Sequence, residues 1–190
     1  MQAEMIQTLF TRPEGGFLCA RWGRPVAPVI FGLADDSLDI FRAAIRAGYA
    51  HAGHPVTDAD PESGANLMIF FARDWDDLAR LPDLDRLTGM PDLPARLRAD
   101  GADQYRLFRF DEAGAIRACL IFLSMDGPLA EAHPAALAER LMMQSALTFA
   151  TEIAPSADLA ALIRAAYDPV LPAAATDASH ALRLAARIAA

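Results

Sequence analysis

The sequence contains no lysine, so all 17 of its basic residues are arginines. Against 25 acidic residues this leaves a net charge of −8 at pH 7. General nucleic-acid binding depends on clustered cations that contact phosphates, and the acidic balance therefore argues against it. The sequence also lacks the run of about 18 uncharged apolar residues that a membrane span needs. We therefore expect no nucleic-acid partner and no transmembrane segment.

Cysteine is scarce, since only Cys19 and Cys119 are present, each within an apolar run. This context favours two buried thiols that pack as small hydrophobic side chains. A disulfide between them stays open as an alternative, and it would need neighbouring strands in an oxidising compartment. Residues 1–10 show neither the basic nor the apolar region of a signal peptide. We predict a cytoplasmic protein, or a periplasmic one if an export signal was removed ahead of Met1.

The common catalytic motifs are missing as well. The sequence has no Gly-x-Ser-x-Gly, no P-loop, no Gly-x-Gly-x-x-Gly and no Cys-x-x-Cys. A zinc peptidase helix carries His-Glu-x-x-His, and the only similar register here is residues 138–142. Glu139 stands where the general base would be, but Ala138 and Met142 replace the two histidines. We therefore predict no cofactor and no catalytic residue, with Glu139 as the only candidate.

His51 and His54 form the only close pair of histidines. Two imidazoles at this spacing can reach one zinc ion, but a zinc site also needs a third ligand and an open position. The simpler interpretation is a helix C-terminus at which both histidines interact with free carbonyls. The acids at residues 58, 60 and 62 alternate as in a calcium loop, without its glycine or its distal acid. We predict no bound metal, with His51 and His54 as the candidate ligands.

Hydrophobic patterning predicts an α+β fold with a mixed, mostly antiparallel sheet and packed helices in one domain, 1–190. Within it we expect an N-terminal extension (1–16), the sheet with the main helices (17–151) and a C-terminal helical pair (152–190). Strands are predicted at residues 17–22, 26–31, 67–71, 105–110 and 116–123, of which the last two form a hairpin. Helices are predicted at residues 74–80, 93–99 and 134–151, at a segment capped by residues 35–37, and after caps at Ser156 and Thr176.

Three segments carry a resemblance to a known family: Arg-Trp-Gly-Arg-Pro-Val at 21–26, an Ala-Asn dipeptide opening the apolar strand at 65–70, and a Tyr-Asp-Pro ending at 167–169. They resemble an uncharacterised proteobacterial family of zincin-like layout, many of whose members are exported proteins or lipoproteins. The resemblance spans about residues 18–188 and implies a zincin-like fold. The family's long helix opens with Cys and carries paired Glu followed by Gln, whereas this chain has His133, Glu139-Arg140 and Gln144. The resemblance therefore implies architecture and transfers no site.

The function expected from these patterns is that of a non-catalytic domain, a pseudoenzyme, that binds a partner protein or assembles as a homo-oligomer. The reason is that the hydrophobic pattern of a folded core is complete, whereas the zinc-peptidase register at residues 138–142 lacks both histidines. Arginine suits such surfaces, because a guanidinium makes planar contacts and tolerates partial desolvation. The alternative is a hydrolase or small-ligand-binding domain with a cleft bordered by His51, His54 and Glu139.

Overall fold

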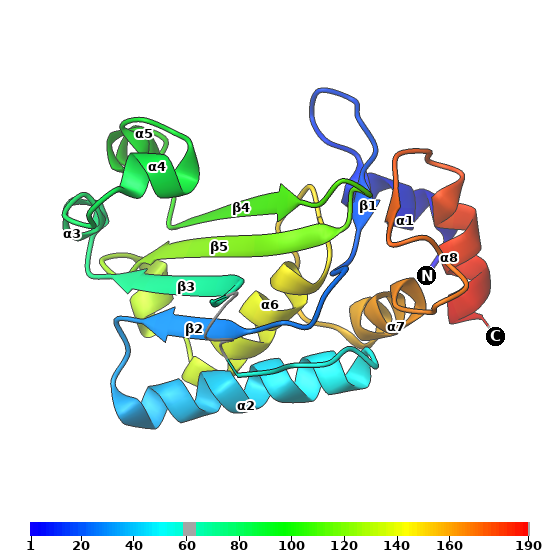
Figure 1. Ribbon diagram of the computed structural model, residues 1–190, viewed down its shortest axis with the longest axis horizontal. Helices are drawn as coiled ribbons and strands as arrows, with labels where there is room; N and C mark the ends of the chain where they lie inside the picture. The colour runs from blue at the N-terminus through cyan, green and yellow to red at the C-terminus, as the bar shows by residue number, and fades with distance from the viewer. Residues whose placement is uncertain (59–63, 190) are drawn as a thin grey trace.

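The computed structural model describes residues 1–58 and 64–189. Its centre is a four-stranded sheet in the order β2-β3-β5-β4 (Figure 1). Those strands are β2 (Pro28–Phe31), β3 (Leu67–Ala72), β4 (Gln104–Phe110) and β5 (Ile116–Ser124). A separate two-stranded sheet joins β1 (Cys19–Ala20) to β6 (Ala174–Ala175). The predicted α+β class is confirmed.

The sheet is mixed, as the sequence predicts. The predicted hairpin β4–β5 is antiparallel, and so is the pair β1–β6. The pairs β2–β3 and β3–β5 are parallel, because the segments between these strands cross over and return the chain in the same direction. Antiparallel pairing thus holds for the hairpin and the small sheet, while the interior of the main sheet is parallel.

The inner strands are covered on both faces, as the continuous apolar run in β3 indicates. Leu67 and Ile69 face the main core, whereas Phe70 and Phe122 face a second, smaller cluster. Two helices that pack against each other cover the main core, and three short helices cover the second cluster (Figure 1). The two are α2 (Asp35–His51) and α6 (Pro134–Ala146), and the three are α3 (Trp75–Leu78), α4 (Leu84–Thr88) and α5 (Leu93–Ala99).

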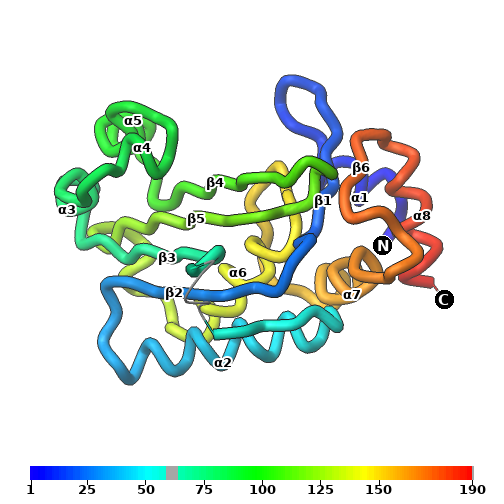
Figure 2. Tube along the Cα trace, in the orientation of Figure 1, coloured from blue at the N-terminus to red at the C-terminus, as the bar shows by residue number. Residues whose placement is uncertain are grey.

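The two ends of the chain meet at one end of the molecule, where α1 (Ala3–Phe10) packs against α8 (His180–Ile188) (Figure 2). Residues 1–16 are therefore more than an extension, since Ile6 and Phe10 are fully buried in the main core. The remaining helical elements are the 3-10 turn η1 (Pro128–Glu131) and α7 (Ala157–Ala166). None of the helices within 1–58 and 64–189 is both long and apolar enough to cross a membrane.

The long helix is shorter than the sequence predicts, because α6 ends at Ala146 and not near residue 151. Leu147 is extended, with φ −139° and ψ 162°, and it forms an antiparallel bridge with Arg21. The apolar residues after Ala146 continue the helical pattern in sequence, but they pack as an extended segment. Phe149 stacks on Phe10 at 5.1 Å between ring centres, which fixes that segment against α1.

The predicted helix starts are confirmed in part. Ser156 caps α7, since its hydroxyl accepts from the backbone N–H of Leu159. The cap expected at Thr176 is wrong, because α8 starts after Ser179. Helix α2 starts after Ala34, and its acidic residues 35 and 36 lie in the first turn rather than at the cap.

Asn66, the only asparagine of the sequence, links the beginnings of β2 and β3. Its Oδ1 accepts from the backbone N–H of Ala27 at 2.7 Å, and its Nδ2 donates to the carbonyl of Pro25 at 2.8 Å. Asn66 is 8% exposed, so both bonds are shielded from water. The Ala-Asn dipeptide is thus a structural connection between two parallel strands.

Candidate functional site

The last turn of α6 ends inside the protein, where its free carbonyl oxygens need donors from other elements. Three side chains that are distant in sequence supply these donors. Arg106 donates to the carbonyl of Gln144 at 2.8 Å, and the Trp22 indole donates to that of Ser145 at 2.8 Å. The Tyr167 hydroxyl donates to the carbonyl of Ala146 at 2.9 Å. The end of α6 is therefore held by β4, by the segment after β1 and by the end of α7.

Arg106 is the charged member of this set, and it projects from β4 towards the main core side of the sheet. Its Nη2 donates to the carbonyl of Phe149 at 2.7 Å, and its guanidinium lies 5.2 Å from the ring centre of Phe108. No ion pair to a carboxylate is found for it in the described part of the chain. Burial lowers the pKa of Arg106 from its ordinary value, because a charged group loses hydration there. The carbonyl end of α6 has a partial negative charge that stabilises the guanidinium, and the negative charge of Glu152 nearby opposes the lowering of the pKa.

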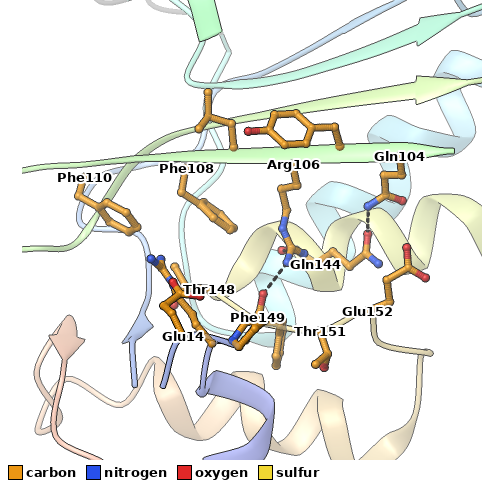
Figure 3. A pocket seen from close by; sticks show the side chains of 15 residues that line it. Glu14, Gln104, Arg106, Phe108, Phe110, Gln144, Thr148, Phe149, Thr151 and Glu152 are labelled. Carbon is orange, nitrogen blue, oxygen red and sulfur yellow. Dashed lines mark hydrogen bonds between the residues drawn. The ribbon is translucent and has the colours of Figure 1, made fainter. Parts of the chain in front are cut away.

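Arg106 lines a pocket of about 560 Å³ beside β4 (Figure 3). Three segments form the walls: the loop 12–14, strand β4, and residues between 144 and 152 at and after the end of α6. Aromatic rings and polar side chains share the lining. The rings that lie on the same side as Arg106 are Phe108 and Phe110 of β4 and Phe149 of the facing segment (Figure 3).

Two glutamines lie at one side of this pocket. Nε2 of Gln104 donates to Oε1 of Gln144 at 2.6 Å, and Gln144 is only 1% exposed. Oε1 of Gln104 is buried and has no hydrogen-bond partner among the residues that the structure describes. A buried acceptor without a donor costs about 1–3 kcal/mol. This oxygen is therefore a ready acceptor for an N–H or O–H group that enters the pocket.

The pocket is lined by charged residues of both signs. Two positive residues, Arg12 and Arg106, line it together with two negative ones, Glu14 and Glu152. No histidine, cysteine or serine is among its described lining residues, so the nucleophile and base pairs of acyl-transfer enzymes are not formed there. The Thr148 hydroxyl is engaged in the fold, because it donates to the carbonyl of residue 18 and accepts from the N–H of residue 20.

The pocket adjoins an open sheet edge, because β4 is the outermost strand on its side (Figure 1). Gln104 lies opposite Leu123 in the register, and at the adjoining position the Ser124 N–H donates to the Asp103 carbonyl at 2.9 Å. In an antiparallel pair, such hydrogen-bonded positions alternate with positions whose backbone groups point outward. Tyr105 and Leu107 therefore bond to β5.

The same alternation directs the backbone N–H and C=O groups of Gln104, Arg106 and Phe108 away from β5, to the open edge. Cys119, which lies opposite Phe108, agrees with this pattern, because its N–H donates to Asn66 on the side of β3. The three residues with outward backbone groups are also among the residues that line the pocket. Hydrogen-bonding backbone and a side-chain pocket thus lie together along one strand.

The structure brings two of the three sequence-predicted candidates together. His51 and Glu139 line a second pocket of about 360 Å³ where α2, α6 and α7 meet. The other lining residues are apolar or lack a side chain: Ala44, Ala47, Gly48, Met142, Met143, Ala160 and Ile163. His54 is not part of this pocket, and its ring lies against Tyr49 and Tyr167.

Both histidines contact backbone carbonyls, although not those of the helix that precedes them. Nε2 of His51 lies 3.2 Å from the carbonyl of Ala160, and Nε2 of His54 lies 2.9 Å from that of Arg24. A carbonyl can only accept, so each imidazole donates. Across residues 1–58 and 64–189, no three metal-ligating side chains gather into a site. Most of the acidic run considered for calcium, residues 59–62, lies outside the described residues.

The two cysteines are free and buried, in β1 and in β5. Burial raises the pKa of the Cys19 and Cys119 thiols to about 12 each. The thiolate is the reactive form of cysteine, so neither side chain is suited to nucleophilic chemistry near neutral pH.

No family model, curated protein or solved structure matches this chain. In the chain's own geometry, the pocket beside β4 combines polar and aromatic side chains with outward-facing backbone groups. Arg106 and its neighbours were not among the residues predicted from the sequence. The signal was present in the pattern Gln-x-Arg-x-Phe-x-Phe at 104–110, which places polar and aromatic side chains on one face of a strand.

Proposed function

We propose that this protein is a non-catalytic binding domain that receives an extended segment of a partner protein along the open edge of β4. One observation carries the proposal: Gln104, Arg106 and Phe108 direct their backbone groups outward and their side chains into an adjoining pocket. In strand addition, main-chain hydrogen bonds supply affinity and pockets for alternate side chains supply specificity. No part of the proposal depends on the resemblance to the zincin-like family.

The composition of the pocket supports a protein ligand. Phe108, Phe110 and Phe149 offer apolar contact area, while Gln104 offers an acceptor without a partner. A volume of about 560 Å³ can hold one or two side chains of a bound strand. Such a mixture of aromatic and polar groups is typical of protein interfaces.

Amide hydrogen exchange followed by NMR tests the open edge in the free protein. We expect the amides of Arg106 and Phe108 to exchange much faster than those of Tyr105 and Leu107, which serve as internal controls in the same strand. Slow exchange at all four positions in the free protein would show that the edge is already covered, and would overturn the proposal.

Binding is tested with peptides selected from a phage-displayed library of random decapeptides. The expected peptide slows exchange at Arg106 and Phe108 and loses affinity for Phe108→Ala. Phe31→Ala is the matched control, because Phe31 is a partly exposed aromatic residue on the opposite edge strand β2. Peptides that leave the β4 amides unprotected, or a selection that yields no binder, would contradict the proposed function.

A second candidate function is favoured by one observation, the meeting of His51 and Glu139 at the pocket between α2, α6 and α7. It is the hydrolase or small-ligand-binding alternative. Metal analysis of protein purified without a chelator tests it: stoichiometric zinc that is lost in His51→Ala would support this alternative. A metal-free protein whose melting temperature is unchanged by His51→Ala and His54→Ala would remove it.

A further inference from the structure

We infer that the segment received by β4 carries a single acidic side chain opposite Arg106, with an apolar side chain two residues away opposite Phe108. This inference rests on the proposed function and specifies the chemistry of its partner. It follows from the charge and the surroundings of Arg106.

Arg106 has neutral hydrogen-bond partners in the free protein, and the exposed Glu152 acts on it only through its nearby negative charge, without forming an ion pair. Its guanidinium donates to two backbone carbonyls, those of Gln144 and Phe149, and no carboxylate of the described chain pairs with it. A strand added to β4 would cover the pocket and remove further water from this charge. Burying a charge is unfavourable unless a counter-charge and hydrogen bonds replace the lost hydration. A carboxylate on the incoming strand supplies both.

The geometry of strand pairing places that carboxylate within reach. Residues directly opposite each other on one face of a sheet have Cβ atoms about 4.5–5.5 Å apart. A guanidinium has five N–H donors in a planar fork, and the two bonds to carbonyls leave donors of Arg106 free for an incoming carboxylate. Charge-assisted hydrogen bonds of this kind are stronger than neutral ones.

Phe108 determines the neighbouring position. Its ring lies on the same face as Arg106, two residues along the strand, and it lines the same pocket (Figure 3). Aromatic cross-strand pairs gain most from apolar or aromatic partners. The incoming segment therefore alternates an acidic and an apolar residue on the face that meets the pocket.

The remaining charges restrict the segment to one acid. Besides Arg106, the described lining of the pocket has two negative residues, Glu14 and Glu152, against one positive residue, Arg12, and the whole chain carries −8, so a run of acids would be repelled. The inward-facing Arg106 also discourages strands that bring no acid, since charges that point inward on edge strands oppose non-specific pairing. Arg106 would thus favour a segment that carries one acid, while the negative charges disfavour a segment with several acids.

The experiment uses the decapeptide selection described above, followed by synthetic peptides of the selected consensus. We expect a conserved Asp or Glu and an apolar residue two positions away. Replacing that acid by its amide, Glu→Gln or Asp→Asn, is expected to weaken binding about tenfold or more. The same replacement should have little effect on binding to Arg106→Gln. Arg109→Gln is the matched control, because Arg109 projects from β4 to the opposite face, where it donates to the carbonyls of residues 87 and 88.

The outcomes separate the two proposals. Peptides that protect the β4 amides but bind equally well with the acid or its amide would overturn the acid requirement and leave the proposed function standing. Peptides that bind elsewhere, or none at all, would overturn the proposed function and the acid requirement with it. Because Arg106 also holds the end of α6, circular dichroism of Arg106→Gln must show a folded protein. If Arg106→Gln is not folded, the acid requirement is tested by comparing the acid peptide and its amide on the unmodified protein alone.

Discussion

The guanidinium of Arg106 donates to the backbone carbonyl of Gln144 at 2.8 Å, which ties the edge strand β4 to the last turn of α6. A second bond to the carbonyl of Phe149 extends this connection into the segment after the helix. One side chain thus stabilises a helix end and places a positive charge in the pocket. Its structural contribution can be measured separately from any binding.

Arg106→Ala is expected to lower the free energy of unfolding by about 3 kcal/mol, because two charge-assisted bonds to buried carbonyls are lost. Urea denaturation measures the change. Arg117→Ala is the matched control, since Arg117 is an exposed arginine on β5, and its loss should cost less than about 0.5 kcal/mol. Equal losses for the two variants would show that Arg106 does not stabilise the end of α6.

Gly32 is expected to tolerate no side chain. Its φ is +85°, and a Cβ placed there would overlap the backbone carbonyl of Phe71. Gly32→Ala should lower the free energy of unfolding by about 3 kcal/mol, from strain in φ together with the overlap. Gly15, with φ +92° and open space around it, isolates the strain, and Gly15→Ala should cost only about 1 kcal/mol. Similar values for both would mean that the close approach to Phe71 is relieved at little cost.

Phe70 is the middle ring of a stack that crosses three strands, with Phe31 at 4.7 Å on one side and Phe122 at 4.9 Å on the other. Phe70→Ala should lower the free energy of unfolding by about 3–5 kcal/mol, as for a buried aromatic residue. Phe31 is 45% exposed, so Phe31→Ala should cost only about 1 kcal/mol. A loss below about 1 kcal/mol for Phe70→Ala would contradict its place inside the second cluster.

Stability is expected to decrease in mild acid because of His54. Burial lowers the pKa of His54 from its ordinary value, and the nearby positive charge of Arg21 adds to this, while the bond to the Arg24 carbonyl opposes it. The unfolded chain then binds a proton more readily than the folded chain. The free energy of unfolding should be highest above about pH 6.5 and fall as the pH drops from there through the folded pKa.

Urea denaturation at several pH values between about 8 and 5 measures this decrease, and His54→Gln should make it shallower. His51→Gln, at an exposed histidine, is the control. Burial also lowers the pKa of His180, so part of the decrease should remain in His54→Gln. The pKa values of Asp77 and Asp177 are lowered as well, and they affect stability only below about pH 4, outside this range. An unchanged slope in His54→Gln would contradict the contribution of His54.

The local sequence pattern predicted the helices and strands whose conformation is determined by residues close together in the chain. The helix at Leu93–Ala99 and the hairpin of β4 and β5 follow from apolar spacing and a glycine-containing turn, and both are observed. The predicted end of the long helix, residue 151, was wrong, since α6 ends at Ala146. The sequence of residues 147–151 is compatible with a helix, so local pattern could not show this. Their extended form depends on a bridge from Leu147 to Arg21, a residue that is distant in sequence.

The sequence by itself determined the α+β class, the burial of both cysteines and the absence of histidines from the zinc-peptidase register of the long helix. Apolar spacing and residue type are local properties, so they can be read without knowing which elements become neighbours. Only the tertiary structure decided that β4 lies at an open edge and that Arg106 meets carbonyls 38 and 43 residues away. From sequence alone, a charged residue in a strand is predicted to be exposed to solvent. Its burial and its hydrogen-bond partners depend on packing between segments that are distant in the chain.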